Sequence, residues 1–430
     1  MEGSSVQAAE EGPPGARAGR AAAVVSLAVL IVAVAALFHG CAGPQRRPEA
    51  YTPPGAAAPP GAVAQARPGT ASPAMPPGPG APEARPVRVR LDGIGARVIL
   101  EGEAIRVWAP GGTLLAEGSG TAVLAARGDR IAWGSAREFP SPADFGAPGG
   151  LRADGKRFSG RIRVTAKAGK LQVVAVVPLE EYVAAVISRE APRGFAAGAL
   201  EALAVAARTY ALGAMAKPRD PAYDVVSGVE DQLFQGTENS DGPFRAAVEA
   251  TRGMVLVYRD ALARAVYHST CGGRTENAAD AWGGDVPYLR SIACDDCRDS
   301  PTWRWRYRMS RAEGKRVALA LGIRAGDSLD MSVVGMTRTG RASRIRLTAG
   351  GVSRETTAAS FRQAAGYGKV KSLKMKIAPA GGGWTLSGEG YGHGVGMCQW
   401  GANGMARKGS GFREILARYY PGTGVTGGGR

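Results

Sequence analysis

Hydrophobic and polar residues alternate over short stretches from Val87 onward, and this pattern predicts β-strands. Glycines separate the first of these runs, as in a strand-rich subdomain. The run from Arg161 to Pro178 reads as a hairpin whose turn falls at Ala168-Gly169. Strand-like runs return in the second half of the chain, in MVLVYR, AVYHST, SRIRLTAGG and KMKIAP.

The period of the apolar residues changes from two to about 3.6 after the hairpin, which predicts helices. Two helices are expected over 179–192 and 198–217, and a last amphipathic helix over 412–420, before Pro421. Strands and helices are segregated rather than regularly alternating, so we expect an α+β fold. It comprises a β-rich N-terminal part, central helices, further strands and a C-terminal helix.

The first part of the chain has a different composition. A polar segment, 1–20, precedes an uncharged apolar run from Ala21 to Phe38 that is followed by Cys41. Residues 21–41 predict either an uncleaved membrane anchor or a lipoprotein-type signal with lipid attached to Cys41. Arginines before the apolar run place the bulk of the protein outside the cytoplasm. Residues 42–86 are rich in Pro, Ala and Gly and predict a linker without a core of its own.

The chain has 430 residues and a formal net charge of +17, so nucleic acid, anionic lipid and acidic polymers are all permitted partners. No nucleic-acid-binding motif is present. Basic and aromatic residues interleave only in TWRWRYR (302–308), which also reads as a strand with Trp303, Trp305 and Tyr307 turned inward. We expect no nucleic-acid partner.

One acidic residue interrupts the apolar face of the helix predicted over 179–192. Glu190 lies seven residues after Val183 and four after Val186, on the face that also carries Tyr182 and Ile187. It belongs to the last turn, because Pro192 disfavours helical backbone before it. Partial burial and the negative helix end both raise the pKa of such a carboxyl group, which suits a general acid. Nearby arginines oppose this shift: Arg189, Arg193 and Arg208. Other acidic residues read as ordinary helix-start or exposed charges: Glu180, Glu181, Glu201 and Glu276.

A glycine-rich loop, GYGHGVGMCQWGA, runs from Gly390 to Ala402. This density of glycine lets another group approach the backbone closely, which favours a binding surface. The loop contains neither the GxxxxGK[ST] pattern of a P-loop nor the G-x-G-x-x-G spacing of a dinucleotide-binding turn.

Several blocks resemble the SpoIID/LytB family, the stage II sporulation protein D group. They are LEEYVAAVISREAPRGFAAGALEALAVAARTYAL, HSTCGGRTEN, DAWGGDVPYL, GYGHGVGMCQWGANGMA and FREILARYYPGT. They follow the family's order and cover roughly 87–423. The corresponding domain spans 87–424, with a β-rich part (87–157) and a catalytic core (158–424), and leaves a tail at 425–430.

The resemblance implies a peptidoglycan lytic transglycosylase. Such enzymes cleave denuded glycan strands between N-acetylmuramic acid and N-acetylglucosamine and leave a 1,6-anhydro end, and their catalytic Glu matches Glu190. LytB-type relatives imply the alternative, a non-catalytic enhancer of a cell-wall N-acetylmuramoyl-L-alanine amidase. The motif positions imply a sugar cleft lined by Arg208, Ser269, Gly272, Gly273, Thr275, Tyr391, His393 and Gln399.

This chain departs from the family pattern at two places. Leu203 stands where the family usually has Gln. The segment 219–236 has neither His nor Cys, so the zinc site that some members hold there is not carried over.

Four cysteines remain besides Cys41: Cys271, Cys294, Cys297 and Cys398. The CDDC spacing of the middle pair is typical of metal ligands. If their motifs share the cleft, as the resemblance implies, the four thiols converge on a structural zinc, with His268 or His393 as a possible substitute ligand. Disulfides are the alternative in an oxidising compartment, pairing Cys271 with Cys398 and Cys294 with Cys297. A nucleophilic cysteine paired with His393 is a third possibility.

Overall fold

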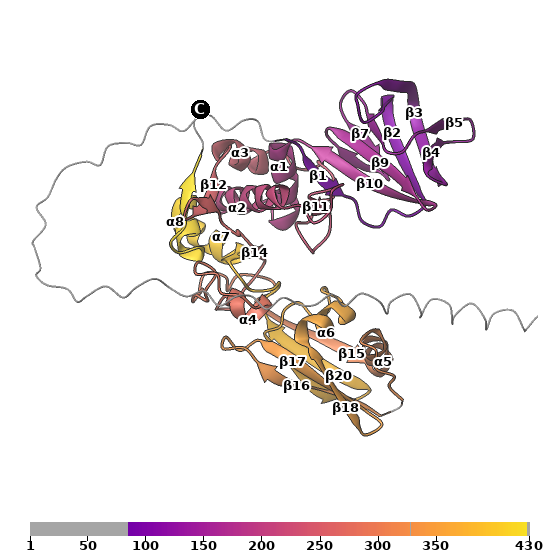
Figure 1. Ribbon diagram of the computed structural model, residues 1–430. Helices are drawn as coiled ribbons and strands as arrows, with labels where there is room; N and C mark the ends of the chain where they lie inside the picture. The colour runs from indigo at the N-terminus through magenta and orange to yellow at the C-terminus, as the bar shows by residue number, and fades with distance from the viewer. Residues whose placement is uncertain (1–84, 327, 428–430) are drawn as a thin grey trace, which may run out of the picture. The chain divides into compact units, whose positions relative to one another are not determined.

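The computed structural model describes residues 85–326 and 328–427 (Figure 1). The predicted polar segment, the anchor or signal over 21–41, nearly all of the linker and the last three residues lie outside these ranges. Within the described ranges, no helix is both long and apolar enough to cross a membrane. The fold is α+β, as predicted, and strands dominate its N-terminal part.

The strand-rich part is a single sheet in the order β11-β1-β10-β9-β6-β2-β3-β4-β5, and β7 pairs with both β2 and β8. The bounds are β1 Val87–Arg90, β2 Arg97–Trp108, β3 Leu114–Arg127, β4 Arg130–Trp133, β5 Arg137–Phe139, β6 Ala143–Gly146, β7 Leu151–Ala153, β8 Lys156–Phe158, β9 Arg161–Lys167, β10 Lys170–Val177 and β11 Val225–Val226.

Strands β9 and β10 form the predicted hairpin, which is confirmed. Ala168 and Gly169 both have positive φ angles, 49° and 72°, as a two-residue turn between twisted strands requires. Alternate residues of β9, such as Ile162 and Val164, are fully buried. The sheet continues to Val177, past the boundary expected at residue 157.

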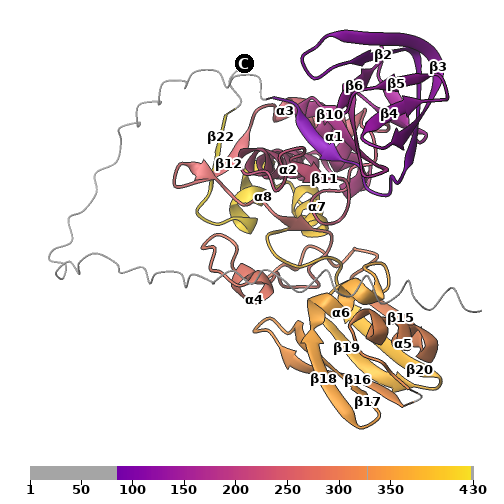
Figure 2. The same cartoon turned by 45° about the vertical axis from the view of Figure 1, so that its right-hand side comes forward.

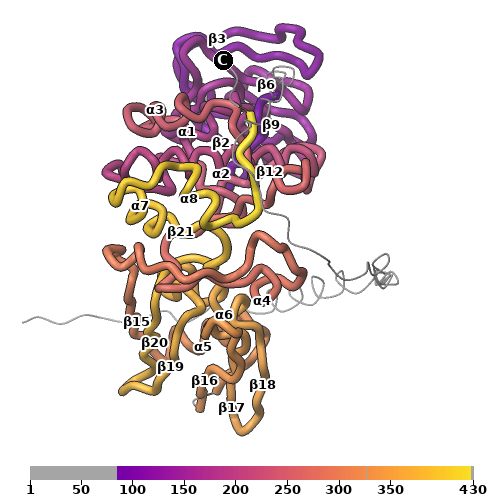
Figure 3. Tube along the Cα trace, turned by 90° about the vertical axis from the view of Figure 1, so that its left-hand side faces the viewer, coloured from indigo at the N-terminus to yellow at the C-terminus, as the bar shows by residue number. Residues whose placement is uncertain are grey.

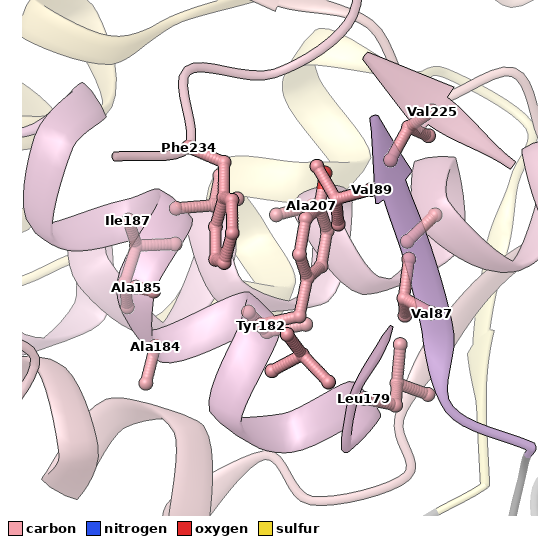
Figure 4. Packing of buried hydrophobic residues seen from close by; sticks show 14 of the residues in the cluster. Val87, Val89, Leu179, Tyr182, Ala184, Ala185, Ile187, Ala207, Val225 and Phe234 are labelled. Carbon is pink, nitrogen blue, oxygen red and sulfur yellow. The ribbon is translucent and has the colours of Figure 1, made fainter. Parts of the chain in front are cut away.

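The central part is helical. Its helices are α1 Leu179–Glu190, α2 Ala197–Ala216, α3 Pro243–Ala250, α4 Ala278–Trp282, α7 Gln399–Arg407 and α8 Phe412–Tyr419. Helix α1 ends where predicted, because Ala191 before Pro192 is extended (φ −128°, ψ 143°). Its apolar face is buried: Figure 4 shows Tyr182 beside Phe234, with Val87 and Val89 of β1 close by, and the two rings are 5.3 Å apart.

Short strands join distant segments of this part. They are β12 Val255–Tyr258, β13 Ala261–Leu262, β14 Tyr267–His268, β21 Met397–Cys398 and β22 Gly424–Thr426. Strand β22 pairs with β12 near the C-terminus (Figure 3). Strand β14 pairs in parallel with β21, so His268 lies opposite Cys398. This pairing brings the HSTC motif to the glycine-rich loop.

A second hydrophobic core lies between Trp305 and Leu386. Its elements are β15 Arg304–Ser310, α5 Arg311–Ala320, β16 Leu329–Met336, β17 Ala342–Ala349, β18 Val352–Thr357, α6 Ala358–Ala365, β19 Met375–Ala380 and β20 Gly383–Glu389. They form two three-stranded sheets with both helices beside them (Figure 2). In β15 the predicted alternation is confirmed, since Trp305 is buried and the arginines of the strand are exposed.

The prediction that Arg208 lines the cleft is wrong. Its side chain is fully buried on α2, and its guanidinium contacts both carboxylate oxygens of Glu180 at 2.9 and 2.6 Å. It also donates to the Met254 carbonyl at 3.0 Å. The sequence places Arg208 near Glu190 along the chain, but helix packing turns it toward the start of α1.

The variant Arg208→Met should lower the free energy of unfolding by about 3 kcal/mol, because it leaves the largely buried Glu180 carboxylate without its partner. The double variant Arg208→Met/Glu180→Gln should lose less of the free energy of unfolding than the single variant does. Chemical denaturation of the three proteins measures both differences. If Arg208→Met instead keeps the stability of the wild type but binds glycan more weakly, the result would support the predicted position of Arg208 in the cleft.

Candidate active site

A cleft of about 1310 Å³ is lined by the end of α1, by α2, by the loop before α3, by the HST and glycine-rich motifs and by residues of the second core. Five of the residues selected from the sequence line it: Glu190, Ser269, Tyr391, His393 and Gln399. Residues that are far apart in the sequence therefore meet at one site, as the family motifs imply.

Glu190 is the last residue of α1 and is half-buried in this cleft. Its Oε1 accepts a hydrogen bond from the Leu233 backbone N–H at 3.0 Å, and its Oε2 accepts one from the Gln399 amide at 3.2 Å. Burial raises the pKa of Glu190, whereas these two hydrogen bonds lower it, and burial is the larger effect. The pKa is therefore raised, whereas the sequence left open whether burial or the nearby arginines would have the larger effect.

The arginines expected to oppose this shift are not among its causes. Arg208 contacts Glu180, and Arg193 lies 3.4 Å from Asp241. The groups that hold the carboxylate are instead uncharged: one backbone amide and one glutamine side chain. A carboxyl group held in this way can both release and recover a proton within one site.

A buried polar chain lies behind Glu190. The Tyr182 hydroxyl donates to Gln232 Oε1 at 3.0 Å, and Gln232 Nε2 donates to the Tyr267 hydroxyl oxygen at 2.9 Å. Burial raises the pKa of both phenols well above 10, and the nearby Glu190 adds to this. Tyr267 lines the cleft as a neutral hydroxyl.

The sequence reasoning missed Tyr267 and Gln232. The available signals were weak: Tyr267 precedes the HST motif on a strand, and Gln232 lies in a loop. Only the fold places both next to the end of α1.

Two histidines share one wall of the cleft, with ring centroids 5.6 Å apart. His268 Nδ1 donates to the Val395 carbonyl at 3.0 Å, which leaves its Nε2 as an unpartnered acceptor. Burial lowers the pKa of His268 well below 6.5 and that of His393 to about 4. Both rings are therefore neutral at neutral pH.

Trp282 stands beside His393, with ring centroids 5.1 Å apart, and 42% of its surface is exposed. The Arg264 guanidinium lies 4.6 Å from the Trp282 ring. Both residues line the cleft. Trp282 belongs to the DAWGGDVPYL block, but its own position in the cleft was not singled out from the sequence.

The reading of Glu276 as an ordinary exposed charge is wrong. It is 1% exposed and lines the same cleft as Glu190. Its Oε2 accepts hydrogen bonds from the Thr337 and Thr339 hydroxyls at 2.7 and 2.6 Å, and its Oε1 accepts one from the Asn277 N–H at 2.8 Å. These contacts tie the second core to the central part.

Three further expected cleft residues do not line the cleft. Thr275 is 1% exposed, and its backbone and hydroxyl bond to Ile292. A side chain at Gly272 would meet Glu389, and one at Gly273 would meet Trp303. Both glycines have positive φ, so they shape the turn that follows Cys271.

The four cysteines converge behind the cleft wall. All are buried, none is bonded to another, and their sulfur atoms lie within 4.8 Å of one another. The structure contains neither of the two disulfides that were the alternative to a metal site. Neither histidine belongs to this group of potential metal ligands. Cys398 is not part of the cleft lining, and the structure does not pair it with His393.

The fold and cleft define an α+β protein that presents a carboxyl group with a raised pKa at a helix end. Comparisons with known proteins identify its family. The model of the SpoIID family, described as Stage II sporulation protein, matches residues 167–258. Stage II sporulation protein D of Bacillus subtilis is 32% identical over 271 residues, which cover 59% of this chain and 76% of that protein. The chain belongs to the SpoIID family.

Two other relatives extend the comparison. An uncharacterized protein of Brachyspira hyodysenteriae is 30% identical over 282 residues, covering 65% of this chain and 75% of the relative. A Bacillus subtilis protein named amidase enhancer is 30% identical over 291 residues, covering 56% of this chain but 40% of its own length.

The raised pKa of Glu190 predicts a pH-dependent effect on stability. The folded state binds this proton more tightly than the unfolded chain, so ionisation of Glu190 costs folded-state stability as pH rises above the ordinary value of 4.5. Glu190→Gln should therefore have a higher Tm than the wild type at pH 7, and this advantage should fade below pH 4.5. Thermal unfolding across this pH range measures the effect.

Glu201→Gln, on α2 and outside the cleft lining, removes the same charge and is the matched control. It should show no comparable pH-dependent gain. A Glu190→Gln protein that is less stable than the wild type at pH 7 would contradict the raised pKa.

Proposed function

We propose that this protein is a peptidoglycan lytic transglycosylase that acts on denuded glycan strands, with Glu190 as its general acid and base. The observation that supports this most directly is the half-buried Glu190 carboxyl, with its raised pKa, at the position of the family's catalytic Glu. Helix periodicity, family motif and cleft geometry select this residue on separate grounds.

The reaction needs one carboxyl group. Neutral Glu190 protonates the glycosidic oxygen as the bond from that oxygen to C1 of N-acetylmuramic acid breaks. The resulting carboxylate then takes the proton of the C6 hydroxyl, whose oxygen closes on C1 to form the 1,6-anhydro ring. Glu190 is neutral again at the end, and no water is consumed. Burial favours the acid form before the first step, and the Leu233 and Gln399 donors stabilise the carboxylate between steps.

The cleft offers suitable contacts for a glycan strand. Trp282 and Tyr391 provide aromatic surfaces for the apolar faces of sugar rings, and Tyr267 provides a neutral hydroxyl. N-Acetylmuramic acid carries a lactyl carboxylate. With Arg208 buried, the exposed Arg264 beside Trp282 is the cation that we assign to this group.

The proposed location is the cell envelope, outside the cytoplasm, with residues 21–41 as membrane anchor or lipoprotein-type signal. A cell-wall amidase is a proposed partner, because one relative carries the name amidase enhancer. That name also supports the second candidate function, a non-catalytic enhancer of an amidase. An enhancer needs the cleft to bind glycan but has no need of an ionisable Glu190.

Peptide-free glycan strands incubated with the purified full-length protein should yield 1,6-anhydro-muramic products, detected by mass spectrometry. Glu190→Gln should lower the rate by roughly 10²–10⁴-fold, the usual contribution of general acid–base catalysis. Glu201→Gln is again the charge-matched control and should retain activity. Equal activity in Glu190→Gln would refute the assignment, and glycan binding without cleavage in the wild type would favour the enhancer.

Trp282→Ala should weaken glycan binding and raise KM more than it lowers kcat, because in the proposed mechanism Trp282 supports a sugar ring and takes no part in proton transfer. Trp108→Ala is a matched control, since Trp108 also carries a stacked arginine, Arg161 at 4.5 Å, but lies outside the cleft lining. Binding isotherms and kinetics with defined glycan fragments measure the difference. Equal effects of the two substitutions would contradict a sugar platform at Trp282.

A further inference from the structure

Three separate chain segments bring four sulfur atoms together. Cys271 follows β14, Cys294 and Cys297 form the CDDC turn, and Cys398 is the N-cap of α7. All four side chains are fully buried, and their sulfurs lie within 4.8 Å of one another. Zn–S bonds of about 2.3 Å in a tetrahedron place sulfurs about 3.8 Å apart, so the cluster has the size of a four-thiolate zinc site.

The arrangement differs from that of two disulfides. Cys271 Sγ and Cys297 Sγ lie 3.5 Å apart, and this pair belongs to neither of the two alternative disulfides, Cys271–Cys398 and Cys294–Cys297. Each cysteine instead has the other three as neighbours. A common centre, rather than two pairs, accounts for this geometry.

Several groups around the sulfurs can donate hydrogen bonds to them. The backbone N–H groups of Cys271 and Gly401 both donate to Cys398 Sγ at 3.3 Å. The Tyr419 hydroxyl lies 3.1 Å from Cys294 Sγ. Donors of this kind stabilise the negative charge that thiolates retain around a divalent metal. A side chain at Gly401 would collide with Tyr419 and Cys294, so glycine is required beside the cluster.

The ligand set selects the metal. Four thiolates without oxygen or nitrogen ligands favour soft metals, and zinc forms closed, redox-inert tetrahedral sites with them. The cluster has no open position facing the cleft, since all four sulfurs are buried. The site therefore suits a structural role.

The cluster is directly connected to the candidate active site. Cys398 precedes Gln399, whose amide donates to Glu190 at 3.2 Å. The Trp400 N–H donates to the carbonyl of Ser269, which lines the cleft two residues before Cys271. Fixing Cys271 and Cys398 therefore fixes the start of α7 and the cleft wall together.

We propose that Cys271, Cys294, Cys297 and Cys398 bind one structural Zn²⁺, which holds the N-terminus of α7 so that Gln399 reaches Glu190. The positioning role rests on the proposed function, whereas the metal site itself does not. This site lies outside segment 219–236, where some family members hold zinc.

Metal analysis of the full-length protein is the first test. A Cys41→Ser background removes the fifth cysteine from the thiol count. We expect about one zinc per chain, and four thiols that react only after denaturation with a chelator. Absence of metal, with the thiols either free or oxidised to disulfides, would overturn the proposal, and so would iron in place of zinc.

Cobalt substitution tests the ligands without any variant that might fail to fold. Exchange of Zn²⁺ for Co²⁺ in the Cys41→Ser protein should give the intense visible absorption of a tetrahedral cobalt thiolate. A spectrum typical of octahedral cobalt would overturn the four-sulfur site. The double variant Cys294→Ser/Cys297→Ser, if folded, should lose the bound zinc.

Hydrogen exchange tests the positioning role independently of activity. Chelation should increase amide exchange over 396–401, whereas the β9–β10 hairpin should be unaffected. Unchanged exchange over 396–401 would contradict the positioning role.

Gln399→Ala should keep one zinc but lose glycan cleavage. If the wild type binds zinc and cleaves no glycan, the proposed function fails and the metal site stands.

Discussion

The proposed chemistry of the cleft depends on the two hydrogen bonds that the Glu190 carboxyl group accepts. The Leu233 N–H and the Gln399 amide reach the same carboxyl group from a loop and from a helix that are distant in sequence. Because burial raises the pKa and the two donors lower it, the environment keeps the acid and its carboxylate closer in energy than burial alone would. Such a balance requires both donors to be held in place by the surrounding fold.

Short pieces of secondary structure provide that support. The parallel pairing of β14 with β21 spans only two residues on each strand, yet it sets His268 opposite Cys398, immediately before Gln399. So few backbone hydrogen bonds between the two strands cannot by themselves hold the cleft wall in place. The buried cysteine cluster and the contacts of Glu276 with Thr337 and Thr339 add connections on either side of it. In the central part, side-chain clusters therefore hold distant segments together, as long strands do in the N-terminal sheet.

Features with a local cause were predictable from the sequence. The hairpin turn at Ala168-Gly169, the end of α1 before Pro192 and the alternation in β15 depend on near neighbours, and all three are confirmed. The burial of Glu190, which is the main cause of its raised pKa, was predictable from helix periodicity, but the absence of an opposing effect from the arginines was not. Arg208 and Glu276 were misread because a charged residue's exposure depends on partners, Glu180 and two threonines, that no local pattern reveals.

The cleft lining contains five acidic residues besides Glu190, which are Asp224, Glu230, Asp231, Glu276 and Asp280. Glu276 is the most deeply buried of them, and its contacts bear on whether it can act as a second catalytic carboxyl group. A glycoside hydrolase normally uses a second carboxylate as nucleophile or to activate water. Glu276 is 1% exposed, and three donors occupy its oxygens. Attack by Glu276 on a sugar carbon, or removal of a proton from a water molecule beside it, would require breaking those bonds, which help to join the second core to the central part. Among the described residues, Glu190 has only two donors, and it lies half-buried at the end of α1. Of these two carboxyl groups, Glu190 is therefore the better placed to exchange protons with a substrate, which is the role that the proposed transglycosylase reaction gives it.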